Sequence, residues 1–162
     1  MKKQFLLLSL LAMALFSCEG DDAQDFALVL DGTYEAVLQS EGRSAGTKMT
    51  FKGDGSLLVE RFVILGDSGV RCHQNYQLGT YSLVNEDFVF TINESYGPDP
   101  LINYSICPSK EDLVPQLGSE PLPVAGTLVL SNAKKNFNLS YECPELLPYM
   151  CLGSNEFELT TP

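Results

Sequence analysis

The chain has 162 residues, in which ten Lys and Arg stand against 21 Asp and Glu, so its formal net charge is −11. This length is enough for about one domain with a real core, and hydrophobic and charged fractions of 44% and 19% are typical of a globular protein. The acidity argues against nucleic acid as a partner, because phosphates attract clustered Lys and Arg. A single His excludes any catalytic or metal site that needs two imidazoles.

The first 17 residues predict a signal peptide. The segment begins Met1-Lys2-Lys3, which is basic, and residues 5–16 form an apolar run that is too short to span a membrane. The run ends in Leu15-Phe16-Ser17-Cys18, which resembles the lipobox of bacterial lipoproteins. This resemblance implies that residues 1–17 are a lipoprotein signal peptide and that Cys18 is acylated. An ordinary signal peptide that is cut elsewhere is the alternative.

An acidic segment follows the lipobox. Residues 18–25 contain Glu19-Gly20-Asp21-Asp22 and Asp25. The segment resembles the acidic export signal that takes some Gram-negative lipoproteins to the outer face of the outer membrane, and a solvated tether is a compatible alternative. We therefore expect an acidic tether over residues 18–25, a membrane partner through the acyl chains of Cys18, and a lipid-anchored location at the cell surface.

Four further cysteines remain after lipidation of the first: Cys72, Cys107, Cys143 and Cys151. An even number in an exported chain indicates two disulfides, and three pairings are possible. We favour Cys143–Cys151 with Cys72–Cys107. Since the sequence contains neither a Cys-x-x-Cys motif nor several His at ligand spacing, we expect no metal site and no cofactor.

From residue 26 onwards, short runs of β-forming residues alternate with turns rich in Gly, Asn and Asp. A long irregular insertion is expected over residues 97–123, with a single helical turn that Ser109 caps. The expected strands cover residues 32–39, 47–52, 57–65, 76–84, 88–93, 127–131, 137–141 and 156–160.

The order of these elements resembles the lipocalin-like domain of small bacterial lipoproteins. Gly32-Thr33-Tyr34, the turn Gly53-Asp54-Gly55-Ser56, Gly79-Thr80-Tyr81, Phe88-Val89-Phe90 and Gly126-Thr127-Leu128 carry the resemblance. It implies one all-β domain over residues 26–162, folded as an antiparallel up-and-down barrel. A β-sandwich is the alternative, since both architectures limit exposed strand edges.

The sequence indicates no catalytic residue. Gly66-Asp67-Ser68-Gly69 matches the nucleophile motif of chymotrypsin-like proteases, but the only histidine, His73, lies five residues downstream. A turn explains the motif better. Cys72 and His73 are neighbours, so on a strand they would point to opposite faces. A pair of carboxylates for hydrolysis stays open, because nothing marks one pair above the others.

The aromatic side chains are the remaining candidates for a ligand site. They would line a cavity for an apolar ligand or simply fill the core, and the core is favoured because a small barrel must be filled. We expect a non-enzymatic protein that binds a small apolar molecule, a glycan or a protein partner; an accessory subunit of an envelope complex and a carboxylate-based hydrolase are the alternatives. The candidate ligand-binding residues are Phe51, Phe62, Tyr76, Tyr81, Phe88 and Phe90.

Overall fold

The computed structural model describes residues 27–40, 43–101, 107–116, 120–142 and 155–161. Within these ranges the secondary structure consists of β-strands and three short 3-10 turns. No helix of the described part is long and apolar enough to cross a bilayer. The strands are β1 (Gly32–Ser40), β2 (Arg43–Phe51), β3 (Ser56–Leu65), β4 (Val70–Val84), β5 (Asp87–Gly97), β6 (Val114–Pro115), β7 (Leu122–Ser131), β8 (Asn136–Tyr141) and β9 (Asn155–Thr161).

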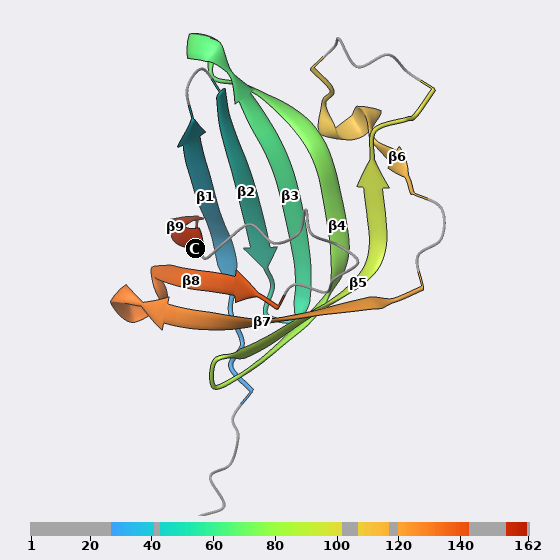
Figure 1. The fold of residues 1–162 in the computed structure, drawn as a ribbon. Coiled ribbons are helices and arrows are strands. Elements are labelled where there is room, and N and C mark those ends of the chain that lie inside the picture. Colours follow the sequence, from blue (N-terminus) through green and yellow to red (C-terminus); the bar gives the residue numbers. More distant parts are fainter. Residues whose placement is uncertain (1–26, 41–42, 102–106, 117–119, 143–154, 162) are drawn as a thin grey trace, which may run out of the picture.

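Eight of these strands close into an antiparallel up-and-down barrel. The order around the barrel is β1-β2-β3-β4-β5-β7-β8-β9, and β9 pairs back onto β1. Figure 1 shows β1 to β4 side by side as one wall, with β7 and β8 crossing them. The short β6 pairs only with the end of β5. The predicted all-β barrel is therefore confirmed, and the sandwich alternative is not formed.

Apart from the short β6, which was not predicted, the observed strands match the predicted ones except for their lengths. The largest difference is in β4, which begins at Val70 rather than at residue 76. Its polar first residues still pair with the end of β3, because the backbone groups of β3 need partners there. A bulge accompanies this pairing: Arg61 lies opposite Asn75 and Phe62 lies opposite His73, so Gln74 is an extra residue in the ladder.

One part of the barrel interior is filled by aromatic rings. Tyr34 packs edge-on against Phe51 with ring centroids 5.7 Å apart, and Phe137 stacks on Phe157 at 4.7 Å. All four side chains are at most 2% exposed. The hydroxyl of Tyr34 donates to the carbonyl oxygen of Lys134 at 2.8 Å, which satisfies its polar end. The inward-facing side chains near these rings therefore form a packed core.

The insertion between β5 and β7 is attached to the wall of the barrel. A disulfide joins Cys107 to Cys72 of β4, as the sequence predicted. Next to it, the backbone N–H of His73 donates to the carbonyl oxygen of Pro108 at 2.9 Å. The predicted turn after Ser109 forms as η2 (Lys110–Asp112). Cys18, the tether, Cys143 and Cys151 lie outside the described residues.

Candidate functional site

The alternation of β3 places an arginine inside the barrel. Leu57 and Val59 are buried in the core, and Arg61 follows in the same period-two register. Its ladder partners are Thr47 on β2 and Asn75 on β4. Arg61 also borders a small space together with the core residues Phe90, Ile92 and Val124. The guanidinium side chain therefore faces the interior.

Arg61 borders two neighbouring cavities. The larger has a volume of about 80 Å³ and the smaller about 10 Å³. We call both together the Arg61 pocket. The larger cavity exists because short side chains line this part of the barrel interior, whereas aromatic rings fill the packed core. Inward-facing residues that line the larger cavity are Ala36, Leu38, Ala45, Thr47, Arg61 and Asn155.

The charge of Arg61 has no protein counter-ion in the described part of the chain. Each ion pair among those residues involves another basic side chain. The Nε atom of Arg61 is buried and has no hydrogen-bond partner, and the same holds for Oδ1 of Asn75. A buried donor or acceptor without a partner costs about 1–3 kcal/mol. The pocket is therefore bordered by a positive charge that has no carboxylate partner among the described residues.

The other polar groups of the pocket do not neutralise this charge. Burial raises the pKa of Tyr141 to about 12, although the nearby Arg61 opposes the rise. The phenol is therefore neutral at physiological pH. Gln77, which is 7% exposed and lines the smaller cavity, is also uncharged. The pocket is consequently cationic inside a strongly acidic protein.

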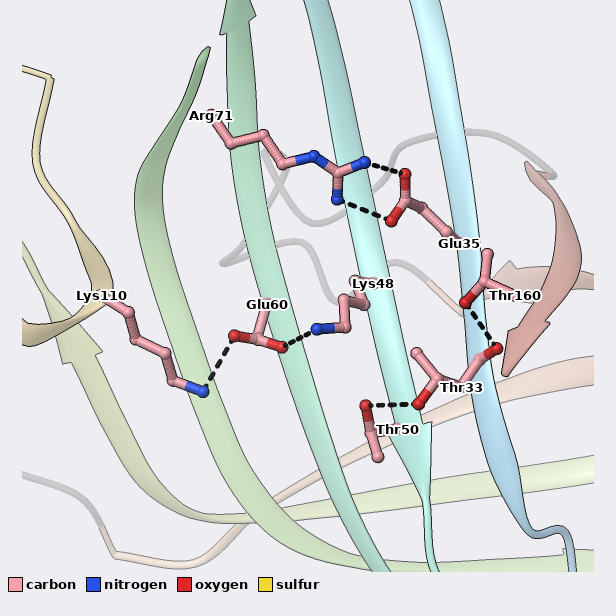
Figure 2. A network of polar contacts seen from close by, with 8 residues as sticks. All are labelled: Thr33, Glu35, Lys48, Thr50, Glu60, Arg71, Lys110 and Thr160. Atoms are coloured by element: carbon pink, nitrogen blue, oxygen red, sulfur yellow. Dashed lines mark hydrogen bonds and ion pairs between the residues drawn. The ribbon is translucent and has the colours of Figure 1, made fainter. Parts of the chain in front are cut away.

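The outer face of the same wall shows the opposite arrangement, with its basic residues paired. Figure 2 shows Arg71 reaching from β4 to Glu35 on β1, and Glu60 lying between Lys48 and Lys110. Both Arg71–Glu35 hydrogen bonds measure 2.8 Å. The two lysines lie 3.2 and 2.9 Å from the carboxylate of Glu60. Thr33 and Thr50 join β1 to β2 by their hydroxyls on this face.

The two lysines keep Glu60 ionised. Burial raises the pKa of Glu60, but the hydrogen bonds from Lys110 and Lys48 outweigh it, so the pKa lies below its ordinary value. Lys110 belongs to η2, so this interaction also holds the insertion against the outer face of β3. The network is structural in character, because each of its three basic residues has a carboxylate partner within the protein.

A pair of tyrosines continues the outer face. Tyr76 of β4 and Tyr96 of β5 are ladder partners whose rings stack at 4.4 Å with only 9° between their planes. The ammonium of Lys110 lies 4.9 Å from the centre of the Tyr76 ring. The hydroxyl of Tyr96 donates to Glu94 at 2.8 Å. Both rings are partly exposed.

The six aromatic residues that were predicted as candidates for ligand binding do not form one site in the structure. Phe51, Phe88 and Phe90 are core residues that are at most 2% exposed. Tyr81 packs against the core, and its hydroxyl both donates to the carbonyl and accepts from the N–H of Leu30. The remaining two, Phe62 and Tyr76, share the face of the sheet on which Glu60 lies, and this face is the outer side of the wall. Only Phe62 and Phe90 border the Arg61 pocket.

Sequence reasoning missed Arg61. A signal was present, because residues 57, 59 and 61 share one face of the predicted strand, and the first two are apolar. The same alternation assigns Glu60 and Phe62 to the outer face. Pattern analysis alone would thus have placed one cation inside the barrel.

The other chemical motifs form no reactive group in the described residues. The hydroxyl of Ser68 donates to the carbonyl oxygen of Leu65 at 2.8 Å, so the Gly66-Asp67-Ser68-Gly69 motif belongs to a turn, as expected. No three His, Cys, Asp or Glu side chains of the described ranges gather where they could hold a metal ion.

Comparisons of the chain with protein-family models, with curated proteins and with solved structures found no match. Function is therefore argued from the Arg61 pocket, the stacked pair of Tyr76 and Tyr96, and the lipobox resemblance.

Proposed function

We propose that the protein is an outer-membrane lipoprotein, anchored at the cell surface through acylated Cys18, whose barrel binds a small anionic ligand without catalysis. The observation that carries the ligand proposal is the side chain of Arg61, which faces the interior without a carboxylate partner among the described residues. The anchoring part of the proposal rests on the lipobox resemblance of residues 15–18.

An anion is the ligand that the pocket favours on electrostatic grounds. A guanidinium stays protonated at every physiological pH, and a charge that is removed from water is destabilising unless it is paired. A carboxylate that accepts a hydrogen bond from Arg61 supplies both the opposite charge and the missing acceptor. Such a bond contributes about 1.5–3 kcal/mol, which corresponds to at least tenfold in affinity.

The dimensions of the pocket favour a small head group. The larger cavity has a volume of about 80 Å³. Pockets for drug-sized ligands are larger, on the order of 300–1,000 Å³. Leu38, which lines the pocket, is 49% exposed and offers an apolar contact where the cavity opens to solvent. A short-chain carboxylate with its head on Arg61 fits this arrangement.

Calorimetric titration tests the proposal with hexanoate as the charged probe and hexan-1-ol as the neutral probe of equal length. We expect hexanoate to bind and hexan-1-ol not to bind. Arg61→Met should weaken hexanoate binding at least tenfold. The matched control is Arg71→Met, which removes an arginine that Glu35 already neutralises on the outer face. Equal affinity of wild type and Arg61→Met for hexanoate would refute the proposal.

Glycan binding on the outer face is a second candidate, and the stacked pair of Tyr76 and Tyr96 favours it. Aromatic faces stack on the C–H faces of sugar rings, while Glu94 and Lys110 supply polar groups beside the pair. Tyr96→Ala should then abolish retention on an immobilised glycan array, whereas Arg61→Met should leave retention unchanged. Retention that survives Tyr96→Ala excludes this candidate.

A further inference from the structure

The smaller cavity of the Arg61 pocket has a lining of its own. Its volume is about 10 Å³, against about 80 Å³ for the larger cavity, so only a guest as small as a water molecule or a single ion suits it. Arg61 borders both cavities. The other described residues that border the smaller cavity do not border the larger one, and they are Gln77, Phe90, Ile92, Val124 and Tyr141.

Two long polar side chains on neighbouring strands border this smaller cavity. Val59 pairs with Gln77, and Arg61 pairs with Asn75, so Arg61 and Gln77 are diagonal neighbours on the inner face, with Cβ atoms about 7–8 Å apart. The guanidinium can only donate hydrogen bonds, and the amide of glutamine donates through its nitrogen. The neutral phenol of Tyr141 adds no negative charge to the lining. A guest of this cavity therefore meets a cation and a second hydrogen-bond donor.

We infer that the smaller cavity binds a halide ion between the guanidinium of Arg61 and the side-chain amide of Gln77. This inference rests on the proposed anion-binding function, because it uses the same positive charge, and it assigns a second anion to a separate cavity. A halide is a single atom that only accepts hydrogen bonds, so it suits both the volume and the donors. Water suits the volume but leaves the interior charge unpaired, and a carboxylate has too many atoms for this cavity.

The apolar part of the lining favours chloride and bromide over fluoride. Phe90, Ile92 and Val124 offer no hydrogen bonds from their side chains, so an ion that enters loses much of its hydration. A charge that leaves water is destabilising, and the loss is largest for the smallest ion, because its charge is the most concentrated. Fluoride therefore carries the same charge as bromide but binds much less, which makes it the matched control ion.

The halide and the carboxylate share one positive charge. Because Arg61 borders both cavities, a halide in the smaller one neutralises the guanidinium that attracts hexanoate into the larger one. Linked binding is reciprocal, so each anion weakens the other by the same factor. The halide is thus the counter-ion of Arg61 in the protein without its carboxylate ligand.

Calorimetric titration of hexanoate in sodium bromide and in sodium fluoride of equal concentration tests this coupling. We expect hexanoate to bind wild type about fivefold or more weakly in bromide than in fluoride. Gln77→Met removes a donor from the smaller cavity alone, so it should remove most of this difference while hexanoate binds in fluoride as it does to wild type. Gln74→Met is the matched control, because Gln74 borders only the larger cavity, and it should keep the difference.

Diffraction from crystals grown in sodium bromide locates the ion independently of any variant. We expect an anomalous bromide peak between Arg61 and Gln77, and it should be absent from crystals of Gln77→Met. A water molecule in place of bromide overturns the inference. A peak that is present in both proteins, without an effect of bromide on hexanoate, marks an adventitious ion only and overturns it as well.

The outcomes of the titration separate the two proposals. Equal affinity for hexanoate in the two salts overturns the halide site and leaves the binding of carboxylates intact. An effect of bromide that is as large in Gln77→Met as in wild type overturns the assignment to the smaller cavity. Failure of hexanoate to bind in fluoride contradicts the proposed function, whereas the bromide peak still decides the halide site.

Discussion

The guanidinium of Arg71 lies 4.4 Å from the centre of the Phe62 ring, on the outer side of the barrel wall. Two hydrogen bonds to Glu35 hold the guanidinium in this position. The ring itself is 1% exposed, although it lies on the outer face. It fits against the wall because its partner on β2 is Gly46, which has no side chain. An aromatic residue is thus buried outside the core, between a glycine and an ion pair.

Gly46→Ala should therefore destabilise the fold. A Cβ atom at this position would lie 2.3 Å from Cζ of Phe62, and the ring cannot move freely because Arg71 covers it. We expect a loss of about 1–3 kcal/mol in the free energy of unfolding, measured by urea denaturation. Gly53→Ala is the control, since its Cβ would meet nothing closer than Asp31 at 3.9 Å. Equal stability of the two variants would show that the ring is not confined.

Glu60→Gln should lower stability at neutral pH by about 1–2 kcal/mol, because the two lysines lose their counter-charge. The pKa of Glu60 is below its ordinary value in the folded state. Its contribution is thus fully present above the pKa of the unfolded chain and is lost as the pH falls through the folded-state pKa. Urea denaturation between pH 7 and pH 3 should show the difference from wild type shrinking below about pH 4.5.

The control for that prediction is the same substitution, glutamate to glutamine, at an exposed position. Glu120 is exposed and lies outside the network, so Glu120→Gln should change stability by less than about 0.5 kcal/mol throughout this range. A difference between wild type and Glu60→Gln that stays constant down to pH 3 would mean that the ion pairs do not stabilise the fold.

Arg61→Met should stabilise the ligand-free protein by about 1 kcal/mol. Replacing an unpaired interior charge with an apolar side chain of similar length removes a desolvation penalty. Arg71→Met should have the opposite effect, a loss of about 1 kcal/mol, because it removes an ion pair and a cation–π contact. Thermal and urea denaturation without added anion compare the two. If Arg61→Met destabilises as much as Arg71→Met, Arg61 supports the fold rather than a ligand.

The barrel could be predicted because its strands alternate and its turns carry Gly, Asn and Asp. The early start of β4 could not be predicted from the sequence, since residues 70–75 are mostly polar. They form a strand only because the end of β3 needs a partner. The disulfide between Cys72 and Cys107 belongs to the pairing that the sequence analysis favoured among three possible ones. The interior position of Arg61 was not predicted, although the alternation of its own strand points it inwards.

The pocket around Arg61 could not be predicted from the sequence, for a different reason. Ala36 on β1 and Thr47 on β2 are partners within one hairpin, but Asn155 on β9 is far from both in the chain. Only the pairing of β9 with β1 brings Asn155 to this wall. Each is an ordinary strand residue by itself, so local pattern carries no sign of a cavity.

Cys18→Ala should release the protein from membranes, because the proposed anchor is the acyl chains on this cysteine. Cell fractionation with immunoblotting measures the distribution between membrane and soluble fractions. Cys143→Ala is a suitable control, since this cysteine follows the predicted signal peptide and is a predicted disulfide partner. Continued membrane association of Cys18→Ala after a salt and carbonate wash would contradict the lipoprotein assignment.

The binding of an anion by Arg61 is tested most directly by nuclear magnetic resonance of the arginine side-chain Nε–H groups during titration with hexanoate. The Arg61 signal is assigned by its absence from the spectrum of Arg61→Lys. We predict that this signal shifts in a saturable manner and that its proton exchanges more slowly with solvent, while the signal of Arg71 stays in place. An Arg61 signal that does not move in folded protein at saturating hexanoate would contradict anion binding in the barrel.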